Sequence, residues 1–173
     1  NYFGSTESDS LLNRIRYMIV GLNARWLVLD HLSIVVSGMD QSADERRTID
    51  HLMTELRSLV EETQASLVLV SHLKRLQGGQ RGFEQGATPM LSHLRGSAAI
   101  EQLSDIVIGL GRDQQSDVDS NLCEVRVLKN RWTGQLGRAG YLHYNTDTGR
   151  LLEHAGPDAT VGFTAQTEDS SWK

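Results

Sequence analysis

The sequence of 173 residues, with 39% hydrophobic and 23% charged residues, is long enough for one globular domain with its own core. It has no apolar run that could span a bilayer and no signal peptide, so we expect no membrane contact. Its single cysteine excludes an internal disulfide framework. The formal net charge of -5 does not favour nucleic-acid binding, although binding depends on where the basic residues lie.

A helix followed by a buried strand is predicted at the start of the chain. Apolar residues recur at helical spacing between Ser8 and Asn23. The unbroken apolar run 26–29 then ends at Asp30, which predicts a strand over 26–30 buried on both faces, as in a parallel sheet. In such sheets ligands bind at the carboxyl ends of the strands. Asp30 is therefore either a Walker B acid, which holds a magnesium ion on nucleotide phosphates, or an aspartate that starts a turn.

A long amphipathic helix is predicted next. Ser42 and Glu45 have the spacing of a capping box, and apolar residues continue at helical spacing to about Thr63. The opposite face of this helix is charged, and we expect it to be solvated. Its residues are Arg46, Arg47, Asp50, Glu55, Arg57, Glu61 and Glu62.

A second buried strand over 67–71 leads to His72. Strand, helix and strand form a right-handed crossover unit, because parallel neighbours are connected in that hand. We therefore expect Asp30 and His72 at the same edge of one parallel sheet. His72 is either a functional residue at this edge or a buried histidine with satisfied hydrogen bonds.

The segment 74–92 is a long loop with four glycines, one proline and no apolar period. Loops of this length in a compact domain are usually functional or disordered. Its cations are Lys74, Arg75 and Arg81. They indicate either a mobile loop that grips the phosphate backbone of a nucleic acid or a flexible surface loop.

The remaining pattern predicts a short helix, a third strand and a hairpin. Ser97 is expected to cap a helix that carries Gln102, and 106–110 is expected to be a third buried strand of the parallel sheet. An antiparallel addition is predicted over 122–144, with a last short strand at 151–152. The domain thus covers residues 1–154. The polar segment 155–173 is predicted to be a disordered tail.

Four segments in this order resemble the helicase domain of hexameric, RecA-like replicative DNA helicases of the DnaB type. They are LVLDHLSIVV, VLVSHLK, LRGSAAIEQLSD and VLKNRWTGQLGRAGYLHYN. The likeness extends from about Leu11 to Leu152 and includes the primase-helicases of podophages and Twinkle. It implies an α/β fold: a RecA-like P-loop NTPase core, with a mostly parallel sheet and an antiparallel C-terminal addition.

The resemblance implies roles for five residues in nucleotide hydrolysis. Asp30 matches the Walker B acid that organises Mg²⁺, and His72 and Gln102 match residues that sense the γ-phosphate. Arg131 matches the arginine finger and Lys129 its companion, both reaching into the adjacent subunit's site. In the monomer we expect Arg131 to project outward with no carboxylate to neutralise it.

The resemblance also implies nucleotide-base and DNA contacts. Arg112 and Tyr144 match the pair that sandwiches the base. Lys74, Arg75 and Arg81 fall in the DNA-binding loop that faces the central channel.

The resemblance implies a homo-hexamer that hydrolyses ATP or dTTP with Mg²⁺, translocates 5′-to-3′ on single-stranded DNA and unwinds duplex. It implies a cytoplasmic location in a bacterium or phage-infected cell, or else the mitochondrial matrix. The acidic tail with Trp172 either resembles one that recruits DNA polymerase or is a plain frayed terminus. No G-x-x-x-x-G-K-[ST] motif is present, so we expect the C-terminal part of a longer protein, with half a nucleotide site.

Two alternative functions are compatible with the same fold. One is a non-enzymatic RecA-like interaction domain without a P-loop. The other is a RecA-like recombinase or circadian-type ATPase, which the LRGS segment and the strand leading to Arg131 and Trp132 disfavour relative to the helicase.

Overall fold

The computed structural model describes residues 8–33, 45–76, 81–94 and 98–157. In chain order its elements are α1 (Ser8–Arg16), a π-helical turn (Tyr17–Gly21), β1 (Trp26–Leu29), α3 (Glu45–Thr63), β2 (Ser66–Leu69), a 3₁₀ turn (Leu91–His93), α4 (Ala98–Leu103), β3 (Ile106–Arg112), β4 (Leu122–Asn130), β5 (Gly137–Asn145) and β6 (Arg150–His154). None of the helices in these ranges is long and apolar enough to cross a membrane. The predicted caps at Ser42 and Ser97 and the tail from residue 158 onward lie outside the described residues.

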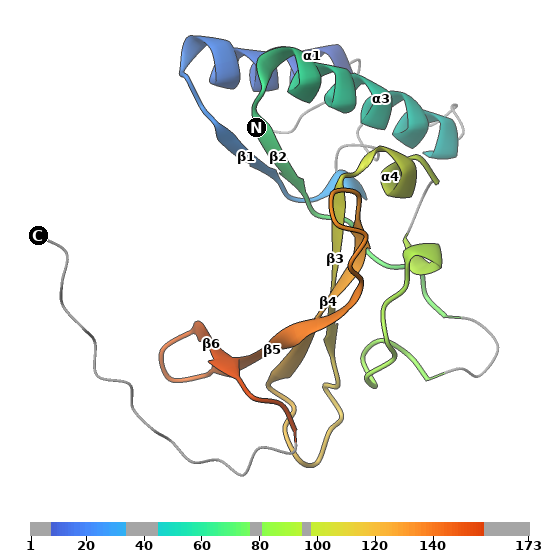
Figure 1. Cartoon of the computed structure of the whole chain (residues 1–173), viewed down its shortest axis with the longest axis vertical. Helices are drawn as coiled ribbons and strands as arrows, with labels where there is room; N and C mark the ends of the chain where they lie inside the picture. The colour runs from blue at the N-terminus through green and yellow to red at the C-terminus, as the bar shows by residue number, and fades with distance from the viewer. Residues whose placement is uncertain (1–7, 34–44, 77–80, 95–97, 158–173) are drawn as a thin grey trace, which may run out of the picture.

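A parallel α/β unit forms the first half of the described chain. β1 and β2 pair in parallel, with Trp26 opposite Ser66 and Leu29 opposite Leu69. α1 and α3 lie together on one side of this pair (Figure 1). Apolar residues at helical spacing explain the packing, because they place one stripe of α3 against the strands. The buried residues of the unit are Ile15, Ile19, Leu27, Leu32, Ile49, Leu52, Met53, Leu56, Leu59 and Ala65.

The strands of this unit are covered on one face only among the described residues, so the prediction of burial on both faces is wrong here. Leu27 points inward and is buried, whereas Trp26 is 75% and Val28 70% exposed. Side chains alternate across a strand, and the two helices contact only one side of the pair. An unbroken apolar run therefore did not distinguish a strand covered on one face from a strand covered on both.

The third strand belongs to a different sheet from the one predicted. β3 pairs antiparallel with β4 in a four-stranded sheet of order β3-β4-β5-β6, and none of these strands pairs with β1 or β2. The short connection 113–121 explains the pairing, because antiparallel neighbours need only a short loop whereas parallel ones need a long crossover. Val107 and Gly109 face inward, and the exposed residues of β3 include Ile106, Ile108 and Leu110.

The first helix also ends earlier than predicted. α1 stops at Arg16, and the π-helical turn continues to Gly21, with the Leu22 amide donating to the Tyr17 carbonyl at 3.2 Å. A π turn spaces its hydrogen bonds five residues apart, which rotates later residues off the stripe. Leu22 is exposed, although the predicted apolar spacing between Ser8 and Asn23 includes it.

Part of the predicted loop is anchored on β3. Pro89 is fully buried and lies over Gly109 and Gly111. A Cβ added at Gly109 would lie 2.9 Å from Leu128 Cδ1 and 3.1 Å from Pro89 Cβ. The glycine thus allows the loop, β3 and β4 to approach closely.

We expect Gly109→Ala to destabilise the fold by about 1–3 kcal/mol, because the added methyl group overpacks this contact. The free energy of unfolding is measured by urea denaturation. Gly140→Ala on β5 is the matched control, since a Cβ there meets nothing within 4 Å. Equal stability of the two variants would contradict the close approach.

A charge cluster lies on the antiparallel sheet. Glu124 accepts hydrogen bonds from Arg126 Nη1 at 2.7 Å and from Arg138 Nε at 2.9 Å. Burial, the largest single influence, raises the pKa of Glu124, but the hydrogen bonds from Arg138 and Arg126, together with the positive charges of these arginines, outweigh it. The net pKa is lowered.

A folded-state pKa below the unfolded value means that Glu124 stabilises the fold above the ordinary glutamate range. That stabilisation is lost as the pH falls through the folded pKa. We therefore expect Glu124→Gln to make the free energy of unfolding fall less steeply below about pH 4.3 than in the wild type. Chemical denaturation across this range measures the slope. Glu153→Gln, at an exposed position on β6, should leave the slope unchanged.

Candidate functional site

The structure brings Asp30 and His72 to the same edge of the parallel pair. Beyond the strand ends, the Val70 amide donates to Leu29 O and the Leu32 amide to Val70 O, each at 3.0 Å. These hydrogen bonds hold the segment after β1 against the segment after β2. Asp30 is exposed, and among the described residues it has no hydrogen-bond or ion-pair partner.

The histidine next to Asp30 also belongs to this edge. The rings of His31 and His72 meet edge to face, with centroids 4.2 Å apart. His31 Nδ1 is buried and has no hydrogen-bond partner among the residues that the structure describes. Sequence reasoning assigned His31 no role, although its place directly after Asp30 was a signal.

Asp30 is the carboxylate at this edge that could help to hold a magnesium ion. The described residues contain no group of three or more His, Cys, Asp or Glu side chains placed to hold a metal ion. Mg²⁺ commonly takes one or two protein carboxylates and completes its shell with phosphate and water oxygens. One exposed carboxylate at a strand end suits that arrangement.

A second cluster gathers at the C-terminal end of α4. Lys129 Nζ donates to the carbonyl oxygens of Glu101 at 2.5 Å and Gln102 at 3.1 Å, and Arg131 Nη2 donates to Gln102 O at 3.0 Å. The last carbonyls of a helix have no partner within it, so cations bind there readily. The structure therefore places Gln102, Lys129 and Arg131 together.

Arg131 has a carboxylate neighbour, so the prediction that it lacks one is wrong. Arg131 Nη1 lies 3.1 Å from Asp105 Oδ1, and the Arg131 amide donates to Asp105 O at 2.9 Å. Asp105 also accepts a hydrogen bond from Arg57 Nη1 at 2.7 Å, so Arg57 does not lie on a purely solvated face. The hydrogen bonds to Asp105 and then to Glu61 raise the pKa of Arg57.

The predicted base-binding residues share one neighbour. Arg112 donates from Nη2 to Asn121 Oδ1 at 3.1 Å and from Nε to Ser120 O at 2.5 Å, while the Tyr144 amide donates to Asn121 O at 3.1 Å. Arg112 ends β3, at the end of the sheet away from α4 (Figure 1). The described residues thus form separate groups rather than one pocket.

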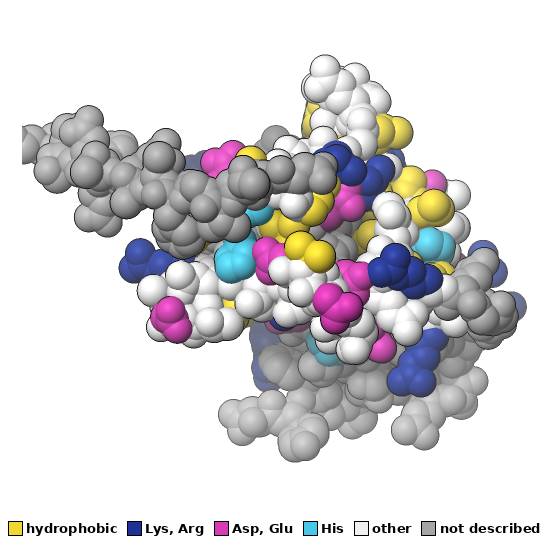
Figure 2. All heavy atoms as spheres, turned by 90° about the horizontal axis from the view of Figure 1, so that it is seen from below, with side chains coloured by type: hydrophobic (Ala, Val, Ile, Leu, Met, Phe, Trp, Pro, Cys, Tyr) yellow, Lys and Arg dark blue, Asp and Glu magenta, His cyan; other side chains and the backbone are white. Residues whose placement is uncertain are grey.

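The loop cations differ in their surroundings. The Lys74 amide donates to His93 O at 2.8 Å, and Lys74 and Arg75 are exposed. Arg81 forms an ion pair with Asp113, and the backbone of Gln85 pairs with that of Asp113 in an isolated antiparallel β-bridge. The face shown in Figure 2 carries basic, acidic and histidine side chains side by side rather than one basic surface.

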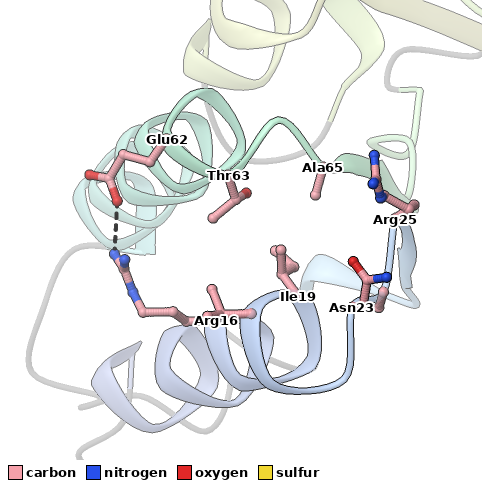
Figure 3. Close-up of a pocket in the computed structure, with 9 residues that line it drawn as sticks. Arg16, Ile19, Asn23, Arg25, Glu62, Thr63 and Ala65 are labelled. Atoms are coloured by element: carbon pink, nitrogen blue, oxygen red, sulfur yellow. Dashed lines mark hydrogen bonds and ion pairs between the residues drawn. The ribbon is translucent and has the colours of Figure 1, made fainter.

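A cavity of about 550 Å³ lies away from all these residues. It opens between the π-helical turn and the end of α3, and the Arg16–Glu62 ion pair bridges one side (Figure 3). Arg25, which precedes β1, also lines it, so the cavity lies at the amino ends of the strands. It is therefore at the opposite edge from Asp30.

The family model and the related sequences point to the same protein family. The family model described as DnaB-like helicase C terminal domain matches residues 4–152. A DNA helicase/primase of Enterobacteria phage T3 is 47% identical over 149 residues, which cover 86% of this chain and 26% of that protein. The replicative DNA helicase DnaC of Bacillus subtilis is 32% identical over 111 residues, covering 61% of this chain and 23% of that protein. The chain thus spans about a quarter of the length of these relatives.

Solved structures give the same fold. A DnaB-like replicative helicase, studied with its interactions with primase, matches with a TM-score of 0.64 at 20% identity, over 86% of this chain and 35% of that one. A KaiC-like protein of Pyrococcus horikoshii matches with a TM-score of 0.58 at 15% identity, over 86% of this chain and 54% of that one. The α/β, RecA-like fold class predicted from the sequence is confirmed.

The contacts of the loop with Asp113 lead to a test. We expect Asp113→Asn to speed amide hydrogen exchange over 82–87 several-fold, because the ion pair to Arg81 is lost while the side-chain oxygen that binds the Gln115 amide is kept. Asp117→Asn, on the same connection, is the control. Unchanged exchange in Asp113→Asn would show that the ion pair does not hold the loop.

Proposed function

The chain belongs to the DnaB-like helicase C terminal domain family, and we propose that it forms part of the motor of a ring-shaped replicative DNA helicase. In this motor, nucleotide hydrolysis drives translocation on single-stranded DNA and unwinding of duplex. The observation that carries the proposal is that Asp30 and His72 follow two parallel neighbouring strands, β1 and β2, at the same carboxyl edge, where the His31 and His72 rings meet. That edge is where α/β proteins hold nucleotide phosphates.

Each subunit would contribute the phosphate side of its own site. Asp30 would hold a magnesium ion, which would supply positive charge to neutralise the nucleotide phosphates during hydrolysis. His72 and Gln102 read the γ-phosphate. We propose that the glycine-rich cradle for the phosphates lies in residues outside this sequence, in keeping with the share of its relatives that the chain spans.

The neighbouring subunit would contribute Arg131 and Lys129. An arginine supplied in trans stabilises the negative charge that develops on the transferred phosphoryl group. The guanidinium is suited to this task because its planar donors match phosphate oxygens in pairs. Such a site is complete only where two subunits meet, which ties hydrolysis to ring assembly.

Two further groups would serve the base and the DNA. Arg112 and Tyr144 bracket the base of ATP or dTTP by stacking, which tolerates different bases. Lys74, Arg75 and Arg81 contact the phosphate backbone of single-stranded DNA in the central channel of a homo-hexamer. Arg81 would first have to leave Asp113.

The remaining parts of the proposal rest on the sequence alone. They are a polymerase contact through the tail 155–173, 5′-to-3′ polarity and action in the cytoplasm or, for a Twinkle-like protein, the mitochondrial matrix. The alternative is a RecA-like interaction domain that hydrolyses nothing.

Mixed rings of the full-length protein separate the two functions. We expect homogeneous Asp30→Asn rings and homogeneous Arg131→Ala rings to assemble but to lose DNA-stimulated hydrolysis, the latter by about 10³-fold or more. Mixing the two variants equally should restore activity, because roughly a quarter of the interfaces then combine an intact Asp30 with an intact Arg131. Phosphate release measures the rate.

Arg150→Ala, an exposed arginine on β6, is the control and should hydrolyse like the wild type. If mixed rings form and no activity returns, Arg131 does not act in trans. If wild-type rings hydrolyse no nucleotide with DNA present, the interaction-domain alternative holds.

A further inference from the structure

One carboxylate ties three elements together beside the proposed trans residues. Asp105 follows α4, accepts from Arg57 of α3 through Oδ2 at 2.7 Å, and lies beside Arg131 at the end of β4. Its Oδ1 is buried and 3.1 Å from Arg131 Nη1, without the alignment of a hydrogen bond. Arg57 therefore binds one oxygen of the carboxylate, and the other oxygen faces Arg131.

Arg131 is held at three points of one short segment. Its backbone amide donates to Asp105 O at 2.9 Å, its Nη2 donates to Gln102 O at 3.0 Å, and its Nη1 faces the Asp105 carboxylate. A guanidinium has five N–H donors, and these side-chain contacts engage only some of them. The side chain stays 43% exposed, so it can be held and still present donors to a phosphate.

We propose that Asp105 is a positioning residue that holds Arg131 against the C-terminal end of α4. This contact couples the nucleotide site of each subunit to that of its neighbour. The inference rests on the proposed function, in which Gln102 reads the phosphate of its own subunit and Arg131 serves the next. The backbone carbonyl of Gln102 binds both Arg131 and Lys129. A shift of α4 when the Gln102 amide engages or releases phosphate is therefore passed to both trans cations.

The arrangement also explains why a carboxylate stands beside an arginine meant for phosphate. An unpaired arginine samples many rotamers, and ordering it costs free energy at the moment of reaction. Contacts to Asp105 and Gln102 order it beforehand, which favours the transition state without strengthening substrate binding in the same subunit. Loss of Asp105 should thus appear in kcat rather than in KM.

The test uses Asp105→Asn in full-length rings. Asparagine keeps the shape and an oxygen for Arg57 but removes the charge opposite Arg131. We expect kcat of DNA-stimulated hydrolysis to fall about tenfold, with KM for the nucleotide and hexamer formation unchanged. Asp105→Glu, which keeps the charge but displaces it by one methylene, should also lower kcat. It serves as the second variant if the asparagine variant does not fold.

Arg57→Gln is the matched control, because it breaks the other ion pair of Asp105 and leaves the Arg131 contact in place. It should lower Tm at least as much as Asp105→Asn while keeping kcat near the wild-type value. In an Arg131→Lys background, Asp105→Asn should cause little further loss, because a lysine cannot span both Asp105 and Gln102.

Three results would overturn the proposal: a wild-type kcat in Asp105→Asn, an equal kcat loss in Arg57→Gln, or full additivity with Arg131→Lys. Failure of the proposed function gives a different result, since either wild-type rings would then hydrolyse no nucleotide or Arg131→Ala rings would hydrolyse it normally. If Arg131→Ala abolishes hydrolysis and Asp105→Asn does not affect it, Arg131 acts in trans but Asp105 does not position it.

Discussion

The parallel register of β1 and β2 is the constraint on which the phosphate edge depends. Leu29 stands opposite Leu69, and α3 packs across the pair with Leu52 and Leu56 fully inside. A slip of one residue would turn the inward leucines to solvent, so the apolar packing holds the register. Asp30 and His72 are carried to one edge as a consequence. The position of the site is thus fixed by core leucines rather than by contacts among the site residues.

Much of this frame was predictable because it rests on short-range patterns. Each of these features is encoded by residues close together in the sequence. They are the helical period of α3, the polar residues at the ends of β1 and β2, and the hairpin of β4 and β5. A crossover of known hand then places Asp30 beside His72. The apolar runs were less informative, because they report that a strand is buried but not on how many faces or in which sheet. The run over β3 did not show that this strand pairs with β4, its neighbour in sequence.

The second cluster lay beyond such reasoning. Arg57 and Asp105 are 48 residues apart, and no local pattern relates an α3 arginine to an acid that follows α4. Helical periodicity shows that Arg57 lies off the core stripe, but it does not show which element covers that position. A free Arg131 was expected for the same reason, since the acid that faces it comes from another element. Ion pairs between distant segments have to be read from the packed structure.

The residue after Arg131 gives this surface an optical property. Trp132 exposes 74% of its surface and lies in the turn that follows β4. An indole that moves from water into an apolar contact emits at shorter wavelength. A neighbouring molecule that packs over this turn would displace water around Trp132. One of the three tryptophans of the chain therefore lies at the place where an adjoining molecule would arrive, and its emission wavelength would change on arrival without any added label.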